Sequence, residues 1–514
     1  MADEESPRSV RARRRRQRQR GIWPPPDALG SLPLDVLDNI LSRLHIHEVV
    51  RTSALSRSWR RRWEALPTVD LLPSPGITAS DVDALLLRRA ATIRSFRLIA
   101  SDPSWSLNTV HDWLFYICND DVKDLVFPYW HNKLKIPSRL FSCLELTSLS
   151  LSFCCLPHVP VGFAGFSNLK VLYLFRVDFQ SHGGRELATL IAASPVLAEV
   201  TLVKALLSGD GHDDDWVIRA PNLRRLIIGL GGEYGGRTEI LPRLEEGCLC
   251  GPNYAKFLMG MAQVTKLSFY CNSILSTEVD VLQRLPFLFE NLRSLVLQVN
   301  YFNMSHILAI FCLLRSAPVL EELDIWGWSK GTREIEANDE FLNAHWIDHM
   351  FAKLHVVRMR NISCLNNEMH FIEFFLSKAR VLQVLSVTLA PNSLCSNKEA
   401  IVDITEYARA SPDAQVIFMG RELESAIEIL RHITYGEGGW IMVMDVCLFT
   451  WMTDNNDHEG EAMLDDHICI PIAWICVVVA GFVPSSLMIC ASREEPPPPK
   501  SVVRENEREL KKRQ

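Results

Sequence analysis

The sequence lacks the short motif that marks many zinc peptidases. Across its 514 residues there is no His-Glu-x-x-His pair, in which two histidines four apart on a helix bind the metal. The fourteen cysteines also lack the repeated close pairs of a zinc site, since only Cys248 and Cys250 approach such spacing and no second pair follows. We therefore predict no catalytic residue, no bound metal and no cofactor.

Two further segments do not change this prediction. The glycine-rich segment 229–236 follows a predicted strand, but its glycine spacing is wrong for a nucleotide-binding loop and no helix opens after it. We interpret it as a flexible loop. The acidic run His212-Asp213-Asp214-Asp215 has no second ligand cluster and is typical of a solvated turn.

The N-terminus lacks an apolar stretch, so we predict no secretory signal peptide. The cysteines often lie in apolar runs such as Phe153-Cys154-Cys155-Leu156, which favours reduced core residues of an intracellular protein. Eight arginines stand between Arg8 and Arg20 although the formal net charge is -7. This arm is either a nuclear-localisation or loose nucleic-acid patch or a disordered tail without a receptor, and we expect no specific nucleic-acid partner.

Large apolar residues with helical spacing are abundant between residues 32 and 63. Leu37, Ile40, Leu41 and Leu44 follow the i, i+3, i+4, i+7 pattern of one helix face, and Pro33 suits the first turn. The pattern resumes near Val49 and again at the later tryptophans, which predicts three short helices. A module this short has too little interior for so many large groups, so the surplus indicates a partner.

At these residues the chain resembles the F-box, a motif of ubiquitin-ligase substrate receptors. The matching elements are Leu32-Pro33, Val36-Leu37, Ile40-Leu41, Leu44, Val50-Arg51-Thr52-Ser53, Leu55-Ser56, Trp59-Arg60 and Trp63. The resemblance implies docking on an Skp-family adaptor, which joins a cullin and a RING subunit. The residues expected to bind the adaptor are Leu32, Pro33, Leu37, Ile40, Leu41, Leu44, Val50, Leu55 and Trp59. The alternative is a helical bundle that packs only on its own chain.

An apolar-x-x-apolar-x-apolar unit then recurs at intervals of about 29 residues, the upper end of the range for leucine-rich repeats. The units begin at Ile93, Val122, Leu146, Leu169, Leu197, Leu223, Val264, Leu292, Leu320, Leu354 and Leu382. The last two apolar positions of each unit are two apart, as a strand with one buried face requires. Helix-like patterns fill the intervals, for example from Ile307 to Leu314. Strand and helix are therefore expected to alternate.

These units resemble leucine-rich repeats, which implies an α/β solenoid with parallel strands on the concave side and helices or irregular turns on the convex side. The family's Asn or Cys after the strand is present at Cys154, Asn272 and Asn300 but absent from most repeats. The spacing of 41 between Leu223 and Val264 suggests an insertion carrying the loop from Gly229 to Arg237.

Near the end of the repeats, the segment from Ala410 to Phe418 resembles the FBD segment of plant F-box/FBD/LRR-repeat proteins. Phe374-Phe375-Leu376-Ser377 and Leu382-Gln383-Val384-Leu385 add to this resemblance. Such a segment would cap the exposed end of a solenoid. The predicted division is a disordered basic arm and proline linker, an F-box, the repeats, an overlapping FBD-like segment and an unassigned tail, at 1–26, 27–72, 85–395, 360–419 and 420–514.

Within the tail, residues 468–491 carry no charged side chain, and the run is long enough to cross a bilayer as a helix. We weigh a tail-anchored protein that faces the cytosol and contacts the membrane here against a buried or aggregation-prone tail. Without a membrane span, a nuclear or cytoplasmic location is expected.

The resemblances imply a non-catalytic substrate receptor that binds an unknown protein for ubiquitination. Such a receptor raises the effective concentration of a substrate lysine near the ubiquitin carrier. Candidate substrate anchors are the aromatic residues near strand ends, because aromatics dominate interface hot spots; alternatively they fill turns. These residues are Tyr129, Trp130, Trp326 and Trp328. The alternative function is an LRR scaffold or tail-anchored recognition protein that recruits no ligase, and an enzyme is a distant third.

Overall fold

The computed structural model describes residues 33–419, apart from short gaps within that range. The gaps are 45, 56–58, 72–76, 99–104, 120, 129–133, 181, 208–215, 231–235, 251–254, 271–284, 302, 328–336, 391–392 and 394–396. Of two compact units, Met1–Gly420 and Arg421–Gln514, only the first contains described residues. The predicted arm 1–26 and the apolar run 468–491 therefore lie outside them. No helix in the described part of the chain is long and apolar enough to span a bilayer.

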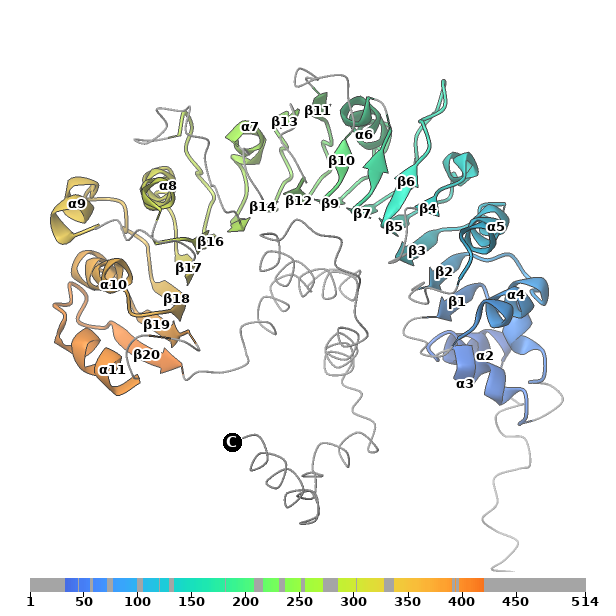
Figure 1. The fold of residues 1–514 in the computed structure, drawn as a ribbon, viewed down its shortest axis with the longest axis horizontal. Coiled ribbons are helices and arrows are strands. Elements are labelled where there is room, and N and C mark those ends of the chain that lie inside the picture. The colour runs from blue at the N-terminus through green and yellow to red at the C-terminus, as the bar shows by residue number, and fades with distance from the viewer. Residues whose placement is uncertain are drawn as a thin grey trace, which may run out of the picture. The chain divides into compact units, whose positions relative to one another are not determined.

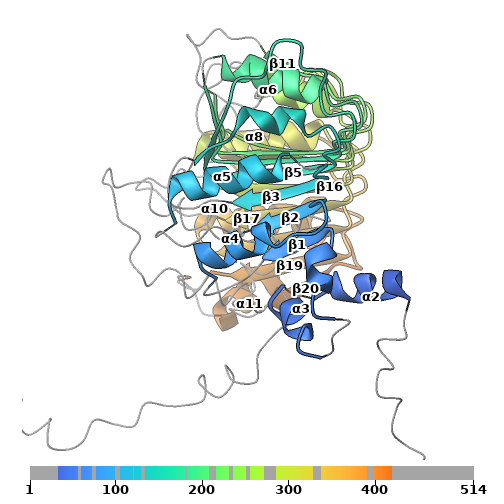
Figure 2. The same cartoon turned by 90° about the vertical axis from the view of Figure 1, so that its right-hand side faces the viewer.

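Three short helices open the described chain, as the sequence predicts. They are α2 (Leu34–Leu41), α3 (Ile46–Thr52) and the 3-10 helix η1 (Arg62–Ala65). Pro33 is the N-cap of α2, with φ at -53°, and Asp35 lies in the first turn, where a negative charge complements the helix dipole. The third element is a single 3-10 turn, and Trp63 within it is buried. Figure 2 shows α2 and α3 next to β1, at one end of the sheet.

One parallel sheet of fourteen strands follows, with the strands in the order of the chain. They are β1 (Thr68–Leu71), β2 (Ser95–Leu98), β3 (Asp124–Pro128), β5 (Ser148–Ser152), β7 (Val171–Phe175), β9 (Glu199–Val203), β12 (Arg225–Gly229), β14 (Glu246–Cys250), β15 (Lys266–Tyr270), β16 (Ser294–Val299), β17 (Glu322–Gly327), β18 (Val356–Ile362), β19 (Val384–Leu389) and β20 (Gln415–Met419). Because successive parallel strands need a crossover, each interval must return the chain to the start of the next strand. This arrangement confirms the predicted solenoid.

Helices lie on the outer side of this sheet and the strands on its inner side (Figure 1). The helices are α4 (Ala79–Leu87), α5 (Leu107–Ile117), η2 (Ser138–Ser142), α6 (Gly183–Ala192), α7 (Ala255–Leu258), η3 (Met259–Met261), α8 (Met304–Arg315), α9 (Asp339–Ala344), α10 (Asn366–Lys378) and α11 (Asn397–Glu406). Short strands pair in two smaller sheets, β10-β8-β6-β4 and β11-β13. Their bounds are Leu134–Lys135 (β4), Cys154–Leu156 (β6), Asp178–Phe179 (β8), Leu206–Leu207 (β10), Trp216–Ile218 (β11) and Gly236–Thr238 (β13).

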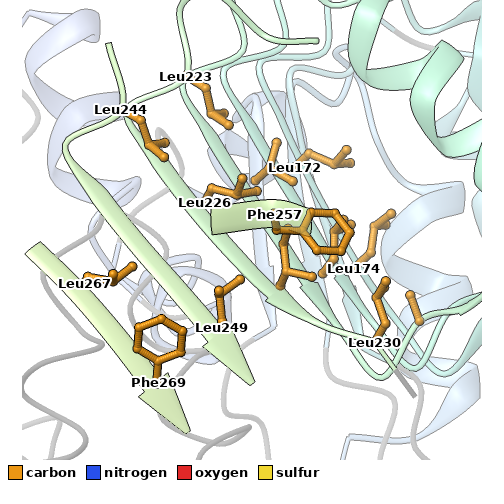
Figure 3. Close-up of a cluster of buried hydrophobic side chains, with 14 of the residues drawn as sticks. Leu172, Leu174, Leu223, Leu226, Leu230, Leu244, Leu249, Phe257, Leu267 and Phe269 are labelled. Carbon is orange, nitrogen blue, oxygen red and sulfur yellow. The ribbon is translucent and has the colours of Figure 1, made fainter. Parts of the chain in front are cut away.

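Each of the eleven predicted units contributes one strand of the large sheet, and its apolar positions stack on those of its neighbours. Leu149 pairs with Leu172, and Leu151 pairs with Leu174 in the same register. The side chains form one continuous buried cluster between the sheet and the outer elements, part of which Figure 3 shows. No single repeat can bury its apolar face alone, so the stacking itself makes the core.

The expected insertion between Leu223 and Val264 is wrong, because the interval contains an additional repeat. The strand β14 pairs with β12 on one side and with β15 on the other. Its central apolar position is occupied by Gly247, where an added Cβ would lie 2.9 Å from Sδ of Met261. The side chain of Met261 fills the space that an apolar side chain at position 247 would occupy. A pattern that requires an apolar residue at this position cannot detect the repeat.

The sheet also extends beyond the predicted units at both ends. At its start, Val69 and Leu71 of β1 are buried and β1 pairs in parallel with β2. At its end, β20 pairs with β19, so the FBD-like residues 415–419 form the last described strand. The assignment of this segment as an FBD-like cap stays a prediction.

The prediction of reduced cysteines is correct for seven described cysteines and wrong for one. The free cysteines in the described part of the chain are Cys118, Cys143, Cys154, Cys155, Cys248, Cys250 and Cys312. Cys364, which follows β18, is disulfide-bonded. Its backbone is in the left-handed region, with φ at 61°. The turn after β18 therefore combines a disulfide-bonded cysteine with a backbone conformation that non-glycine residues seldom adopt.

Candidate functional site

Helix α2 divides its apolar residues between two faces. Leu37 and Leu41, four residues apart, are 2% and 0% exposed, whereas Val36 and Ile40 are 40% and 41% exposed. Residues four apart share a helix face, so the first pair points into the protein and the second pair points to solvent. The single apolar face predicted for Leu37, Ile40, Leu41 and Leu44 is therefore two adjacent faces.

The inward face joins the core that continues into the repeats. Leu37 and Leu41 belong to the same buried cluster as Trp59 and Trp63. The guanidinium of Arg88 lies over the Trp63 ring at 4.9 Å, and its Nη2 contacts Oε1 of Glu64 at 2.8 Å. These contacts join η1 to the residue that follows α4, so the helical module is held on the first repeat.

The outward residues are large, apolar and accessible. We call Val36, Ile40, Val50 and Leu55 the exposed apolar set; Val50 is 42% exposed and Leu55 is 65% exposed. They lie on α2, on α3 and in the turn after α3. Burying each such side chain at an interface gains roughly 25 cal/mol per Å² of apolar area, which makes these helices suited to association.

Exposed arginines outnumber exposed acids among the described residues of this module. The exposed arginines are Arg43, Arg51, Arg60 and Arg61, and the exposed acids are Asp35 and Glu48. One further acid, Asp38, is partly buried and its Oδ1 lies 3.4 Å from Nη2 of Arg62. The surroundings of the exposed apolar set are therefore basic, which favours a partner with acidic groups.

The nine residues predicted to bind the adaptor fall into separate groups. Pro33, Ile40, Val50 and Leu55 are exposed, and Leu44 is half-buried. Leu37, Leu41 and Trp59 are buried in the chain's own core, and Leu32 lies outside the described residues. Val36 was not among the nine, although its spacing of four from Ile40 could have identified it.

Of the predicted substrate anchors, only Trp326 lies within the described residues. It is 8% exposed and the guanidinium of Arg360 lies over its ring at 5.0 Å. Nε of Arg360 donates to both carboxylate oxygens of Asp324, at 3.1 and 3.2 Å. Trp326 is thus packed in a cross-strand cluster within β17, so it is neither an exposed anchor nor the filling of a turn. Tyr129, Trp130 and Trp328 lie outside the part of the chain that the structure describes.

One group of described residues has the spacing of metal ligands. A ligand atom from each of Asp339, His370 and Glu373 lies within 4.8 Å of the other two. Nδ1 of His370 is 3.1 Å from Oδ1 of Asp339, so the imidazole can donate a hydrogen bond to this carboxylate. Asp339 is exposed at the start of α9, and the group forms a polar contact between α9 and α10.

Sequence comparisons agree with this architecture. Residues 29–68 match the model of the F-box domain, and residues 110–325 match the LRR repeats of the FBD-associated F-box protein At5g56370 family. The chain therefore contains an F-box domain and repeats of the type found in FBD-associated F-box proteins. Its helical module is thus the F-box, and the parallel strands of β3 to β17 fall in the repeat region of that family. The resemblance inferred from the sequence is confirmed.

Relatives of this chain that are named as F-box proteins come from Arabidopsis thaliana. The F-box/FBD/LRR-repeat protein At1g13570 is 27% identical over 426 residues, which cover 77% of this chain and 99% of that protein. The F-box protein At1g60400 is 30% identical over 239 residues, covering 43% of this chain and 57% of that protein. Among solved structures, an internalin from Listeria monocytogenes is 11% identical with a TM-score of 0.30, covering 67% of this chain and 90% of that one.

Proposed function

We propose that this protein is the substrate-recognition subunit of a Skp-cullin-F-box ubiquitin ligase. The F-box binds an Skp-type adaptor, which connects it to the cullin and RING subunits, and the repeats bind a protein substrate. The match of residues 29–68 to the F-box supports the class of partner. The exposed apolar set supports the binding surface. The proposal also implies a nuclear or cytoplasmic location.

The observation that carries the proposal is the accessibility of Ile40 beside the buried Leu41, at 41% and 0% exposure. A helix that served only its own core would turn one apolar face inward and leave polar residues outside. Here a second apolar face stays accessible on the F-box. Hot spots of interfaces are apolar or aromatic residues of this kind, surrounded by a polar rim.

The surface also indicates what its partner should offer. The exposed arginines Arg43, Arg51, Arg60 and Arg61 lie in the same module as the exposed apolar set. A complementary partner would present an apolar groove with acidic residues at its rim. Charged rim contacts chiefly accelerate association and fix orientation, whereas the apolar contacts supply most of the affinity. Binding should therefore weaken moderately with salt.

The proposed role requires no covalent chemistry from this chain. Ubiquitin transfer takes place on other subunits, and this protein acts by holding a substrate lysine near the carrier. A rigid connection between the F-box and the repeats matters. The effective concentration of the substrate lysine near the carrier falls when the adaptor-binding and substrate-binding sites can move independently. Trp63, Glu64 and Arg88 join the F-box to the repeats through the contacts described above.

The test is co-purification of the full chain with an Skp-type adaptor. Ile40→Glu places a charge on the exposed apolar set and should abolish co-purification while the protein remains folded. Leu87→Glu is the matched control, because Leu87 of α4 is an exposed leucine at 84% exposure outside the F-box. Co-purification that survives Ile40→Glu, or that is lost equally in Leu87→Glu, would contradict the proposed docking surface and favour the scaffold function.

A further inference from the structure

Three metal-ligating side chains meet where α9 and α10 lie next to each other. A ligand atom from each of Asp339, His370 and Glu373 lies within 4.8 Å of the other two. His370 and Glu373 are three residues apart on α10 and share one helix face, and Asp339 begins α9. Among the described residues, no other His, Cys, Asp or Glu side chains bring three ligand atoms together in this way. The group therefore differs from the ordinary ion pairs of the outer surface.

The backbone that carries Asp339 is held in place against α10. Two residues before it, the backbone N of Ala337 donates to Oδ1 of Asn367 at 2.8 Å, and Asn367 is 1% exposed. Asn367 precedes His370 by three residues on α10, so the two side chains share a helix face. Nδ2 of Asn343 also donates to O of Asp339 at 2.7 Å. The distance between Asp339 and the α10 ligands is thus set by the fold, as a preorganised site requires.

Negative charge gathers around this group. Burial raises the pKa of Tyr407, which follows α11, and the charges of three nearby carboxylates raise it further. These carboxylates belong to Glu373, Asp403 and Asp339. Within the described part of the chain, none of the three forms an ion pair with a lysine or arginine. A bound cation would relieve the repulsion among these carboxylates.

The ligand types and spacing fit zinc. Zn²⁺ binds imidazole nitrogen and carboxylate oxygen at about 2.0–2.2 Å in tetrahedral geometry, so its ligand atoms lie about 3.3 Å apart. Nδ1 of His370 and Oδ1 of Asp339 are already 3.1 Å apart. Because Asp339 is exposed and Glu373 is half-buried, a change of side-chain rotamer can bring the third ligand atom to the same spacing. Mg²⁺ and Ca²⁺ prefer oxygen ligands, so the imidazole favours a transition metal.

We propose that Asp339, His370 and Glu373 form a zinc-binding site that joins α9 to α10 in the last described repeats. Zinc takes the place of the hydrogen between Nδ1 of His370 and Oδ1 of Asp339, and the displaced proton goes to solvent. Glu373 supplies the third ligand and a water molecule the fourth. Repeats near the end of a solenoid have fewer neighbours, so the metal adds a cross-link where stacking contributes least. The site does not depend on the proposed function of the F-box.

Zinc binding is tested by thermal unfolding of the full chain. The protein is stripped of metal with a chelator, freed of the chelator and titrated with zinc chloride. A metal that binds only the folded state raises the unfolding midpoint in a concentration-dependent manner. Magnesium chloride at the same concentrations should leave the midpoint nearly unchanged, because the site contains an imidazole. No zinc-dependent shift in the wild-type protein, or an equal shift with magnesium, would overturn the proposal.

Glu373→Gln separates a metal ligand from a glutamate that serves only the fold. Loss of a supporting residue lowers metal affinity about 10–100-fold in known sites, so loss of this ligand should lower zinc affinity about tenfold or more. In the metal-free protein the same substitution keeps the side-chain volume and removes one of three neighbouring negative charges, so the unfolding midpoint should not fall. Zinc affinity equal to that of the wild-type protein would overturn the role of Glu373 and with it the three-ligand site.

His370→Gln and His158→Gln provide a matched comparison. Nδ1 of His158 lies 2.7 Å from Oε1 of Glu186, which is the same kind of contact, but no third ligand joins this pair within the described residues. His370→Gln should lower zinc affinity about tenfold or more, whereas His158→Gln should leave it unchanged. Cobalt(II) then reports the ligand type: the absorption lost in His370→Gln should lack the charge-transfer band of cysteine thiolates. Equal losses in the two variants, or a thiolate band lost with His370, would overturn the site.

Discussion

Ile40 and Leu41 are consecutive in α2, yet Ile40 is 41% exposed and Leu41 is fully buried. Truncating the buried residue leaves a cavity, so Leu41→Ala should lower the free energy of unfolding by about 2–5 kcal/mol. Ile40→Ala should change it by less than about 0.5 kcal/mol, as is usual at accessible positions. Urea unfolding of both variants checks this division. Equal destabilisation by the two substitutions would contradict the two-faced helix.

Gly247 is expected to be intolerant of large residues because Met261 fills the space beside it. Gly247→Leu would force its side chain against Met261 and Leu267, whose nearest atoms lie 2.9 and 3.1 Å from an added Cβ. The expected loss in unfolding free energy is about 1–3 kcal/mol, the usual range for overpacking. Combining the change with Met261→Ala should recover most of the loss. A double variant no better than Gly247→Leu alone would exclude this explanation.

Asn367 is expected to be essential for stability because it bridges three segments of the repeats. It is 1% exposed, its Oδ1 accepts from the backbone N of Ala337 at 2.8 Å, and its Nδ2 donates to O of Tyr301 at 3.0 Å. Asn367→Leu leaves both backbone groups unsatisfied, which should cost about 2–5 kcal/mol of unfolding free energy. The exposed Asn343 provides the control: Asn343→Ala should cost less than about 0.5 kcal/mol.

The lowered pKa of Lys204 predicts a specific pH dependence of stability. Burial and the nearby charge of Arg176 lower its folded-state pKa to about 8, against the ordinary lysine pKa of 10.5. Between these values the unfolded chain binds more protons at this residue, so the contribution of Lys204 to the free energy of unfolding rises with pH. The free energy of unfolding, measured at several pH values from 7 to 10, should rise more with pH for wild type than for Lys204→Gln. A constant difference over that window would contradict the shifted pKa.

The strands of the solenoid could be predicted because each repeat depends on the same local pattern. Two apolar residues two apart, such as Leu172 and Leu174, bury one face of a strand in any stacked repeat. The repeat of β14 was not predictable in this way, because Gly247 replaces the apolar residue and Met261, fourteen positions later, supplies the volume. Compensation between distant residues leaves no local signal.

The F-box shows a second limit of prediction from the sequence. The spacing of Leu37, Ile40, Leu41 and Leu44 predicts that apolar residues gather on α2, but it does not say which of them face the chain's own core. That choice is made by packing against Trp59 and the first repeat.

The most direct test of the proposed function is calorimetric titration of an Skp-type adaptor into the full chain. Wild type should bind, and Ile40→Glu and Leu55→Glu should each weaken binding about hundredfold or more, as expected for charges placed on buried interface anchors. Leu87→Glu should bind like wild type. An adaptor that binds the Ile40→Glu and Leu55→Glu variants as tightly as wild type, or that binds none of the folded proteins, would contradict the assignment of the exposed apolar set as the docking surface.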